Sequence, residues 1–241
     1  MDEVGIASVN NEIFDNVPYD DHNPKNILEG AKSIIVFGKS MPRSHFKANY
    51  FKPQMLQRAY HSLYKLLDIS GVRLARFMES NGFYGVSIPS YNPLSMKGFE
   101  PWGIISLKHA GYAAGLGIIA KNGLLIHPKH GTLLRLSSVI TTAELISDKM
   151  IDENICLECN LCIENCGGQA FDEKNNFLKF KCLPRTVQTG VAKIGAHLGE
   201  DYYKNIELFT NTLLLEYSIS CEDCLRVCPL NKTPLEEHFR T

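Results

Sequence analysis

The stretch Cys156-Leu157-Glu158-Cys159-Asn160-Leu161-Cys162-Ile163-Glu164-Asn165-Cys166 holds four of the eight cysteines of the chain. The other four also lie in the last part of the sequence, at Cys182, Cys221, Cys224 and Cys228. A secreted protein held by disulfides is usually shorter and spreads its cysteines through the whole fold. Because the first 155 residues contain no cysteine, the crowding predicts bound metal.

The spacing C-x2-C-x2-C-x3-C is that of bacterial ferredoxins with two 4Fe-4S clusters, in which the fourth cysteine binds the other cluster. A second motif, Cys221-x2-Cys224-x3-Cys228-Pro229, follows later in the chain. The same crossing pattern predicts two complete ligand sets. Cluster 1 is expected on Cys156, Cys159, Cys162 and Cys228, and cluster 2 on Cys166, Cys182, Cys221 and Cys224. One departure is that Gly167-Gly168 follows Cys166 in place of proline.

Structural zinc is the alternative, because C-x2-C pairs also form tetrahedral zinc sites. The first motif packs three thiolates more tightly than the usual zinc spacings, and neither set of four needs a histidine. We therefore expect iron–sulfur clusters.

Composition and charge limit the partners. The 241 residues are 44% hydrophobic and carry a formal net charge of −1, so a packed core is expected and nucleic acid is not an expected partner. No apolar run approaches the ~20 residues that span a bilayer. The N-terminal sequence also lacks a signal-peptide pattern. We therefore expect no membrane partner and a cytoplasmic location.

The distribution of cysteine and charge predicts two domains, residues 1–148 and 149–241, with net charges of +3 and −4. Apolar periodicity in the first domain predicts a mixture of helices and strands in layers. Helices are expected over 53–81, with Gly71 as a candidate interruption, and over 104–116. Strands are expected over 34–38, 83–88, 123–128 and 133–141.

The segment from Gly111 to Gly131, GYAAGLGIIAKNGLLIHPKHG, resembles one that precedes the same cysteine motif in epoxyqueuosine reductases and reductive dehalogenases. Lys181-Cys182 and the stretch 221–231 resemble the epoxyqueuosine reductases, whereas the stretch 102–108 is more similar to the dehalogenases. The resemblance runs from about Val4 to Asn231. It implies an α+β, nitroreductase-like domain that binds cobalamin, followed by a small ferredoxin domain of the bacterial two-cluster type.

The resemblance further implies an oxidoreductase that works as a monomer or homodimer. An external ferredoxin or flavodoxin would supply electrons, which pass through two 4Fe-4S clusters to cobalamin for the reduction of a small molecule. Three alternatives stay open. The protein could reduce or handle a corrinoid as its own substrate, it could be a ferredoxin-type electron carrier, or the first domain could hold FMN.

Two departures from the resembled families bear on the substrate. Epoxyqueuosine reductases carry an acidic residue where this chain has the stretch 90–97, SYNPLSMK, and only ten residues follow Asn231. We therefore expect no turnover of epoxyqueuosine in tRNA. Respiratory dehalogenases usually carry a twin-arginine leader and a longer catalytic domain, and we expect neither for this protein.

The candidate residues outside the cysteines come from this resemblance. Tyr91 is the candidate proton donor and Lys108 the candidate group for stabilising an anionic leaving group, although a packing tyrosine and a solvated lysine are the alternatives. The candidate cofactor contacts are Trp102, Gly115, Leu116, Gly117, Asn122 and His127. Glycines allow close approach of a ligand to the backbone, but they also end helices.

Overall fold

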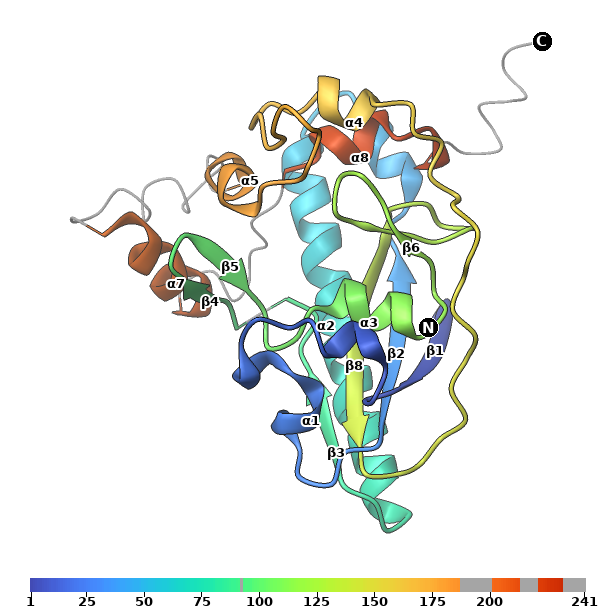
Figure 1. The fold of residues 1–241 in the computed structure, drawn as a ribbon. Helices are drawn as coiled ribbons and strands as arrows, with labels where there is room; N and C mark the ends of the chain where they lie inside the picture. The colour runs from blue at the N-terminus through green and yellow to red at the C-terminus, as the bar shows by residue number, and fades with distance from the viewer. Residues whose placement is uncertain (92, 187–200, 213–220, 232–241) are drawn as a thin grey trace.

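A four-stranded antiparallel sheet forms the centre of the molecule in the computed structural model, which describes residues 1–91, 93–186, 201–212 and 221–231 (Figure 1). The strands, in spatial order, are β1 (Glu3–Ser8), β2 (Ser33–Ser40), β8 (Leu134–Thr141) and β3 (Gly85–Ile88). Strand β2 is central, and its Ile35 lies opposite both Ile6 of β1 and Val139 of β8.

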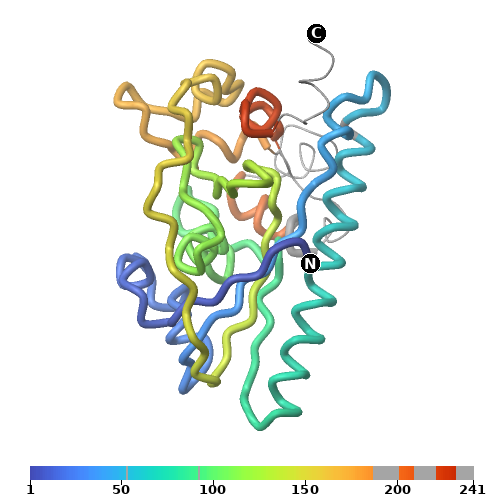
Figure 2. The backbone as a smooth tube through the Cα atoms, turned by 90° about the vertical axis from the view of Figure 1, so that its right-hand side faces the viewer, coloured from blue at the N-terminus to red at the C-terminus, as the bar shows by residue number. Residues whose placement is uncertain are grey.

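Helices cover both faces of this sheet, which explains why the side chains of β2 are apolar on both faces from Ile34 to Phe37. Ile34 and Val36 pack with α3 (Leu107–Ala113) on one face. Ile35 and Phe37 pack with α2 (Lys52–Ser80) on the other. Figure 2 shows the long helix α2 running along one side of the sheet, with the segment between β1 and β2 and α3 on the opposite side. The expectation of a mixed α and β fold is confirmed.

Helix α2 forms where apolar periodicity predicts it, and Gly71 does not interrupt it. A Cβ atom on Gly71 would lie 3.3 Å from Ser87 Cβ and 3.6 Å from Phe37 Cζ. The missing side chain therefore lets the helix approach the sheet closely. Similarly, a Cβ on Gly85 would lie 3.1 Å from Ala75 Cα of the helix.

The other predicted elements form with changed lengths or partners. The expected helix over 104–116 is shorter, because α3 ends at Ala113. The expected strand over 123–128 shrinks to β7 (Leu125–Ile126), which pairs with β6 (Ile118–Ile119) outside the central sheet. A further hairpin consists of β4 (Ser95–Lys97) and β5 (Glu100–Trp102). The short helices of this part are η1 (Glu12–Phe14), η2 (Asp20–His22), α1 (Pro24–Ile27) and η3 (Arg43–Lys47).

The part of the chain after residue 148 contains only short helices among its described residues. They are α4 (Leu161–Glu164), α5 (Lys179–Thr186), α7 (Tyr202–Thr212), α8 (Asp223–Val227) and η4 (Pro229–Asn231). Helices α4 and α8 are in contact at one end of the molecule (Figure 1), while α5 contacts β5 and α7 contacts β4. These contacts join the regions 1–148 and 149–241, whose separation into two domains stays a prediction. In the described residues, no helix is long and apolar enough to cross a membrane.

Candidate functional site

The first cysteine group lines one small cavity. Its four sulfur-bearing residues are Cys156, Cys159, Cys162 and Cys228, and apolar side chains such as those of Ile126 and Leu230 complete the walls. Burial raises the pKa of the Cys162 thiol, and the neighbouring Cys156 raises it further.

A tight loop brings the thiols of this group together. Glu158 and Asn160 both have positive φ, at 52° and 59°, which the chain needs in order to turn within one motif. Lys121, from the loop between β6 and β7, holds the cysteine loop in place. Its Nζ donates to Asn160 Oδ1 at 3.0 Å and lies 3.3 Å from Glu158 Oε2.

The second predicted ligand set comprises Cys182 of α5, Cys224 of α8, and Cys166 and Cys221 outside these helices. Burial, with smaller contributions from the nearby Cys221 and Cys166, raises the pKa of Cys182 to about 11. Burial likewise raises the pKa of Cys224 to about 12, with Cys182 and Cys221 acting in the same direction. The two helices are joined by Arg185, whose Nε lies 3.1 Å from Asp223 Oδ2.

The chemistry of these donors fits two iron–sulfur clusters. All eight cysteines are free thiols, and no histidine lines the cavity of the first group. Burial that raises a thiol pKa disfavours the free thiolate, whereas a bound metal deprotonates a coordinating thiol outright. The four cysteines that line the small cavity are those predicted for cluster 1. The assignment of each cysteine to a cluster stays a prediction.

A second cavity, of about 380 Å³, brings three of the sequence-predicted residues together with a cysteine. Tyr91, Trp102 and Lys108 line it, and so does Cys182. A cavity of this size with mainly apolar walls and a few polar groups is typical of a site for a small molecule or part of a cofactor. Its walls also include Phe177 and the prolines Pro89, Pro93 and Pro101.

Helix α2 positions Tyr91. The Tyr91 ring stacks on Tyr64, with ring centroids 5.1 Å apart and an interplanar angle of 14°. The adjacent Ser90 is fixed by Asp68 of the same helix, because the Ser90 backbone N–H and Oγ–H both donate to Asp68 Oδ1, at 2.8 and 2.7 Å. The loop that carries Tyr91 is therefore held at two points.

Lys108 and Trp102 line the same cavity as Tyr91. Lys108 belongs to the first turn of α3, and its Nζ donates to the carbonyl oxygen of Gly123. Burial, with a smaller contribution from the charge of Lys179, lowers the pKa of Lys108 to about 8. Lys179 also lies over the ring of Trp102, with its Nζ 3.6 Å from the ring centroid.

The structure places the predicted glycine contacts away from this cavity. Gly115 has φ of 71° and ends α3, where Leu116 N–H donates to Gly111 O at 2.8 Å and Gly115 N–H to Tyr112 O at 3.1 Å. This is the pattern of a glycine helix terminus. A Cβ on Gly117 would lie 2.1 Å from Ile126 O, and Leu116 belongs to the main core. These residues therefore have packing roles, and their assignment as cofactor contacts gains no support.

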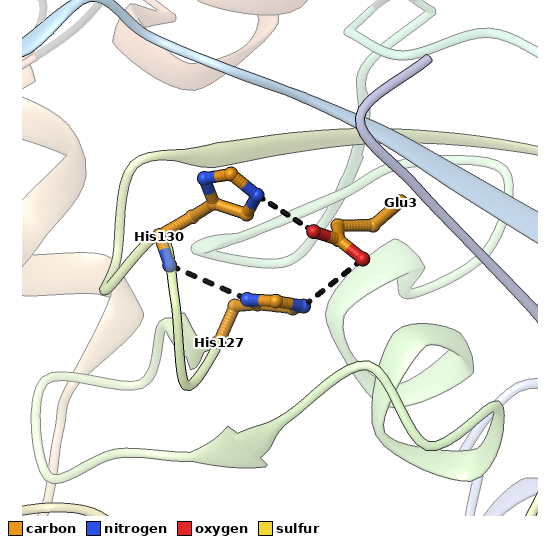
Figure 3. Close-up of side chains that lie close together, drawn as sticks. All are labelled: Glu3, His127 and His130. Carbon is orange, nitrogen blue, oxygen red and sulfur yellow. Dashed lines mark hydrogen bonds and ion pairs between the residues drawn. The ribbon is translucent and has the colours of Figure 1, made fainter.

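Asn122 and His127 also lie outside the walls of the larger cavity. Asn122 is buried and lines the small cavity of the first cysteine group, and its Oδ1 accepts a hydrogen bond from Leu124 N–H at 3.2 Å. His127 belongs to a cluster with Glu3 and His130 (Figure 3). Glu3 and His130 are not among the residues that sequence patterns predict, because Glu3 is far from the histidines in the chain and no motif connects them.

The hydrogen bonds in this cluster decide how it is protonated. His127 Nδ1 accepts from the backbone N–H groups of Lys129 and His130, at 3.0 and 3.3 Å. The proton of the neutral ring is therefore on Nε2, which faces Glu3 Oε2 at 3.6 Å. His130 Nε2 lies 2.8 Å from Glu3 Oε1. A metal would need the Nε2 lone pair of His127, so these contacts favour a hydrogen-bonded cluster over a metal site.

Comparison with known proteins finds similarity to reductases of two kinds. No protein-family model matches the chain. The epoxyqueuosine reductase of Staphylococcus aureus is 26% identical over 219 residues, which cover 87% of this chain and 50% of that protein. That of Lactococcus garvieae is 30% identical over 127 residues, covering 52% of this chain and 32% of that protein. The chain spans about half the length of the curated relative from Staphylococcus aureus.

The solved structures show the same two families. An epoxyqueuosine reductase from Bacillus subtilis has a TM-score of 0.63 at 21% identity, covering 96% of this chain and 62% of that one. A catabolic reductive dehalogenase has a TM-score of 0.57 at 16% identity, covering 99% of this chain and 31% of that one. The chain thus resembles the families that its sequence indicates. Another neighbour is an epoxyqueuosine reductase with a tRNA stem loop, so the expectation that nucleic acid is not a partner finds no support here.

Proposed function

We propose that the chain is an iron–sulfur oxidoreductase that carries electrons through two 4Fe-4S clusters to a cobalamin, for the reduction of a small molecule. One observation carries the proposal: Cys182, a predicted ligand of cluster 2, lines the same 380 Å³ cavity as Tyr91, Trp102 and Lys108. An electron-transfer centre would then border the space in which a substrate reacts. The similarity to reductases of two families supports the same conclusion.

The cavity walls fit part of a flat cofactor. They combine the rings of Tyr91, Trp102 and Phe177 with three prolines and few polar groups. Bound cobalamin would supply a low-valent cobalt centre as the reductant. The protein's own part would be to keep the cavity dry and to hold polar groups in place beside the substrate.

Tyr91 and Lys108 would hold the proton and the charge of the reaction. The Asp68–Ser90 hydrogen bonds and the Tyr64 ring fix Tyr91, so its hydroxyl would donate a proton from a defined position. Lys108 carries a buried amine, which would stabilise negative charge that develops on a substrate or leaving group. General acid catalysis of this kind typically contributes ~10²–10⁴-fold to a rate.

A second candidate function is the reduction or handling of a corrinoid as the substrate itself. Among the described residues, no aspartate or glutamate lines the cavity, and the stretch 90–97 has no acidic residue. A site without a carboxylate acid is less suited to protonating a separate substrate, unless Tyr91 takes that role.

The test is anaerobic purification with reconstitution, followed by analysis of iron, acid-labile sulfide and visible spectra. Two 4Fe-4S clusters require about eight iron and eight sulfide per chain. Added cob(II)alamin should shift to a base-off spectrum with a Kd in the micromolar range or tighter, about −8 kcal/mol. Stoichiometric zinc without sulfide would contradict the clusters. Tight binding of FMN without binding of cobalamin would show that the cofactor is a flavin and not a corrin.

A further inference from the structure

Arg135 of β8 brings a positive charge to the α2 face of the central sheet. Its neighbours Leu134 and Leu136 belong to the core on the α3 side, so the alternation of side chains along a strand turns Arg135 toward α2. There its guanidinium carbon lies 5.2 Å from the centroid of the Tyr60 ring. Arginine stays protonated in proteins, and a permanent cation therefore lies against this helix.

The guanidinium of Arg135 is only partly satisfied by its neighbours. Nη2 donates to the carbonyl oxygen of Thr132 at 3.1 Å, whereas Nε is buried and has no hydrogen-bond partner among the described residues. Burial acts to lower the pKa of the guanidinium, but Tyr60, Tyr64 and Cys224 raise it above the usual value for arginine. No carboxylate is among these three groups. A charge that is removed from water without an anionic partner is costly.

The two tyrosines do not supply an anion. Burial raises the pKa of Tyr60 to about 12. Burial likewise raises the pKa of Tyr64. Both hydroxyls are therefore neutral at neutral pH, and they solvate the charge of Arg135 without cancelling it.

The carboxylates of this region are engaged elsewhere. Asp68 Oδ1 accepts two hydrogen bonds from Ser90. Glu222 caps the start of α8, where burial raises its pKa and the charge of Arg226 opposes that shift. The groups that act most strongly on the pKa of Arg135 include neither carboxylate.

Cys224 is the neighbour that metal binding would turn into an anion. Leu56 and Tyr60 of α2 form one core cluster with Leu225 of α8, and Cys224 packs against that cluster. Tyr60 thus links the two groups, because Arg135 lies over its ring and Cys224 packs against the same cluster. A coordinating thiol is deprotonated by its metal, so an iron–sulfur cluster on Cys224 would place negative charge within reach of Arg135.

We propose that Arg135 is the internal counter-charge of the iron–sulfur cluster that Cys224 holds, and that it raises the reduction potential of this cluster. The inference rests on the proposed function and adds a residue that tunes its electron transfer. Reduction moves one electron from the external donor to the cluster, no bond forms or breaks, and Arg135 keeps its proton. Because the added negative charge lies near a fixed positive charge inside the protein, the reduced form is stabilised more than the oxidised form.

Arg135 acts through the cluster and not on a substrate, because it does not line the 380 Å³ cavity. Cys182, from the same predicted ligand set as Cys224, does line that cavity. A raised potential of this cluster would hold the electron next to the space in which a substrate reacts. Arg135 is therefore a positioning residue for the electron.

The variants Arg135→Gln and Arg135→Lys separate the charge of the side chain from its shape. Both are made in the cluster-loaded full chain, and potentials are measured by anaerobic redox titration followed by electron paramagnetic resonance. In Arg135→Gln, the equilibrium constant for one-electron reduction of cluster 2 should fall about tenfold or more, which lowers the potential by about 59 mV or more. In Arg135→Lys, which keeps the charge, the potential should stay close to that of the unmodified chain.

Cluster 1 and an exposed arginine provide the controls. Cluster 2 is identified as the signal that remains in Cys228→Ser, and the potential of cluster 1 should change less than that of cluster 2. Arg73→Gln removes the same charge at an exposed position of α2, where solvent and salt screen it, and should leave both potentials unchanged. An unchanged potential in Arg135→Gln would overturn the proposal. An equal fall in Arg73→Gln or in Arg135→Lys would overturn it as well.

The iron content decides the case in which Arg135→Gln does not hold cluster 2. If this variant keeps only about four of eight iron while Arg135→Lys keeps both clusters at an unchanged potential, the charge is needed to hold the cluster, which supports the proposal. If both variants lose the same iron, Arg135 acts through its shape and the proposal is overturned. Missing iron and sulfide in the unmodified chain would instead contradict the proposed function. A chain that holds both clusters without binding cobalamin would contradict only the cobalamin part of that function, and the potentials would still test Arg135.

Discussion

Asn231 and Thr132 are joined by two hydrogen bonds that connect the second cysteine motif to the central sheet. Asn231 Oδ1 accepts from the Thr132 backbone N–H at 2.8 Å, and Asn231 Nδ2 donates to Thr132 Oγ1 at 2.8 Å. Asn231 Nδ2 also donates to the carbonyl of Leu225 in α8 at 2.8 Å. Thr132 is buried just before β8. One side chain therefore holds the Cys228 segment against the sheet.

Asn231→Ala should destabilise the cluster-loaded protein by about 1–3 kcal/mol, because it leaves partners of three hydrogen bonds unsatisfied. It should also lower the iron content, since Cys228 loses its anchor. Asn231→Asp keeps the acceptor for the Thr132 N–H but loses the donor and sets a carboxylate oxygen against the Leu225 carbonyl, so it should cost at least as much. Thermal unfolding and iron analysis measure both effects. The control is Asn16→Ala, at an exposed asparagine with one hydrogen bond of 3.4 Å to Glu12 O. An equal loss of stability and of iron in both variants would contradict the anchoring role of Asn231.

The packing role of Gly117 makes a distinct prediction. A Cβ at this position would lie 2.1 Å from Ile126 O and 2.8 Å from the carbon of that carbonyl, so Gly117→Ala forces the backbone to move. We expect a loss near the upper end of the ~1–3 kcal/mol range for overpacking. Gly82→Ala has open space around its Cβ and only the strain of a φ of 81°, which costs about 1–2 kcal/mol.

Stability and cofactor binding separate the two interpretations of Gly117. If it packs against Ile126, urea unfolding of Gly117→Ala shows a larger loss than Gly82→Ala. If it contacts a cofactor instead, Gly117→Ala unfolds like the unmodified chain and only the affinity for cobalamin falls.

Paired cysteine variants test the ligand assignment. Cys228→Ser should remove one cluster, or about four of eight iron, because each 4Fe-4S cluster needs four thiolates. Adding Cys156→Ser should remove no more iron, since both residues are assigned to cluster 1. Adding Cys182→Ser should remove the remaining cluster. Iron and sulfide analysis with electron paramagnetic resonance measures the outcome, and the reverse pattern of losses would refute the crossing arrangement.

The sequence predicts those parts of the fold that local patterns encode. Helix α2 and strand β2 are long or continuously apolar, and both form within one or two residues of the expected bounds. Strand β1 is not predicted, because Gly5 interrupts its short apolar run. That glycine has a non-local reason, since its Cβ would lie 2.2 Å from Ala114 O at the end of α3.

The candidate site likewise has a part that local sequence patterns predict and a part that depends on tertiary packing. Fixed cysteine spacing carries information about a shared ligand, so the two thiol groups could be expected from the sequence. The meeting of Tyr91, Lys108 and Cys182 in one cavity depends on the packing of separate elements. Resemblance suggested two of these residues, but nothing local related them to the cysteine. Glu3 and His130 carried no signal, because their contact joins β1 to a turn more than 120 residues away.

The Glu3–His127–His130 cluster predicts a pH dependence of stability. Burial lowers the pKa of His127, Glu3 opposes this shift, and His130 and Lys129 act in the same direction as burial. The unfolded chain, with a histidine pKa of about 6.5, therefore takes up this proton at a higher pH than the folded protein. The stability that neutral His127 contributes is therefore fully present above the unfolded pKa of about 6.5, and it is lost as the pH falls through the lower pKa of the folded protein.

His127→Asn removes the titrating group while its side-chain oxygen can still accept from the backbone N–H groups of the turn. The melting temperature of the cluster-loaded protein should therefore rise less between pH 6 and pH 8 in this variant than in the unmodified chain. His45→Asn, at a histidine outside the Glu3–His127–His130 cluster, should keep the pH dependence of the unmodified chain. An unchanged slope in His127→Asn would mean that the proton is not coupled to folding at this site. A slope that vanished equally in both variants would show a general effect of losing a histidine.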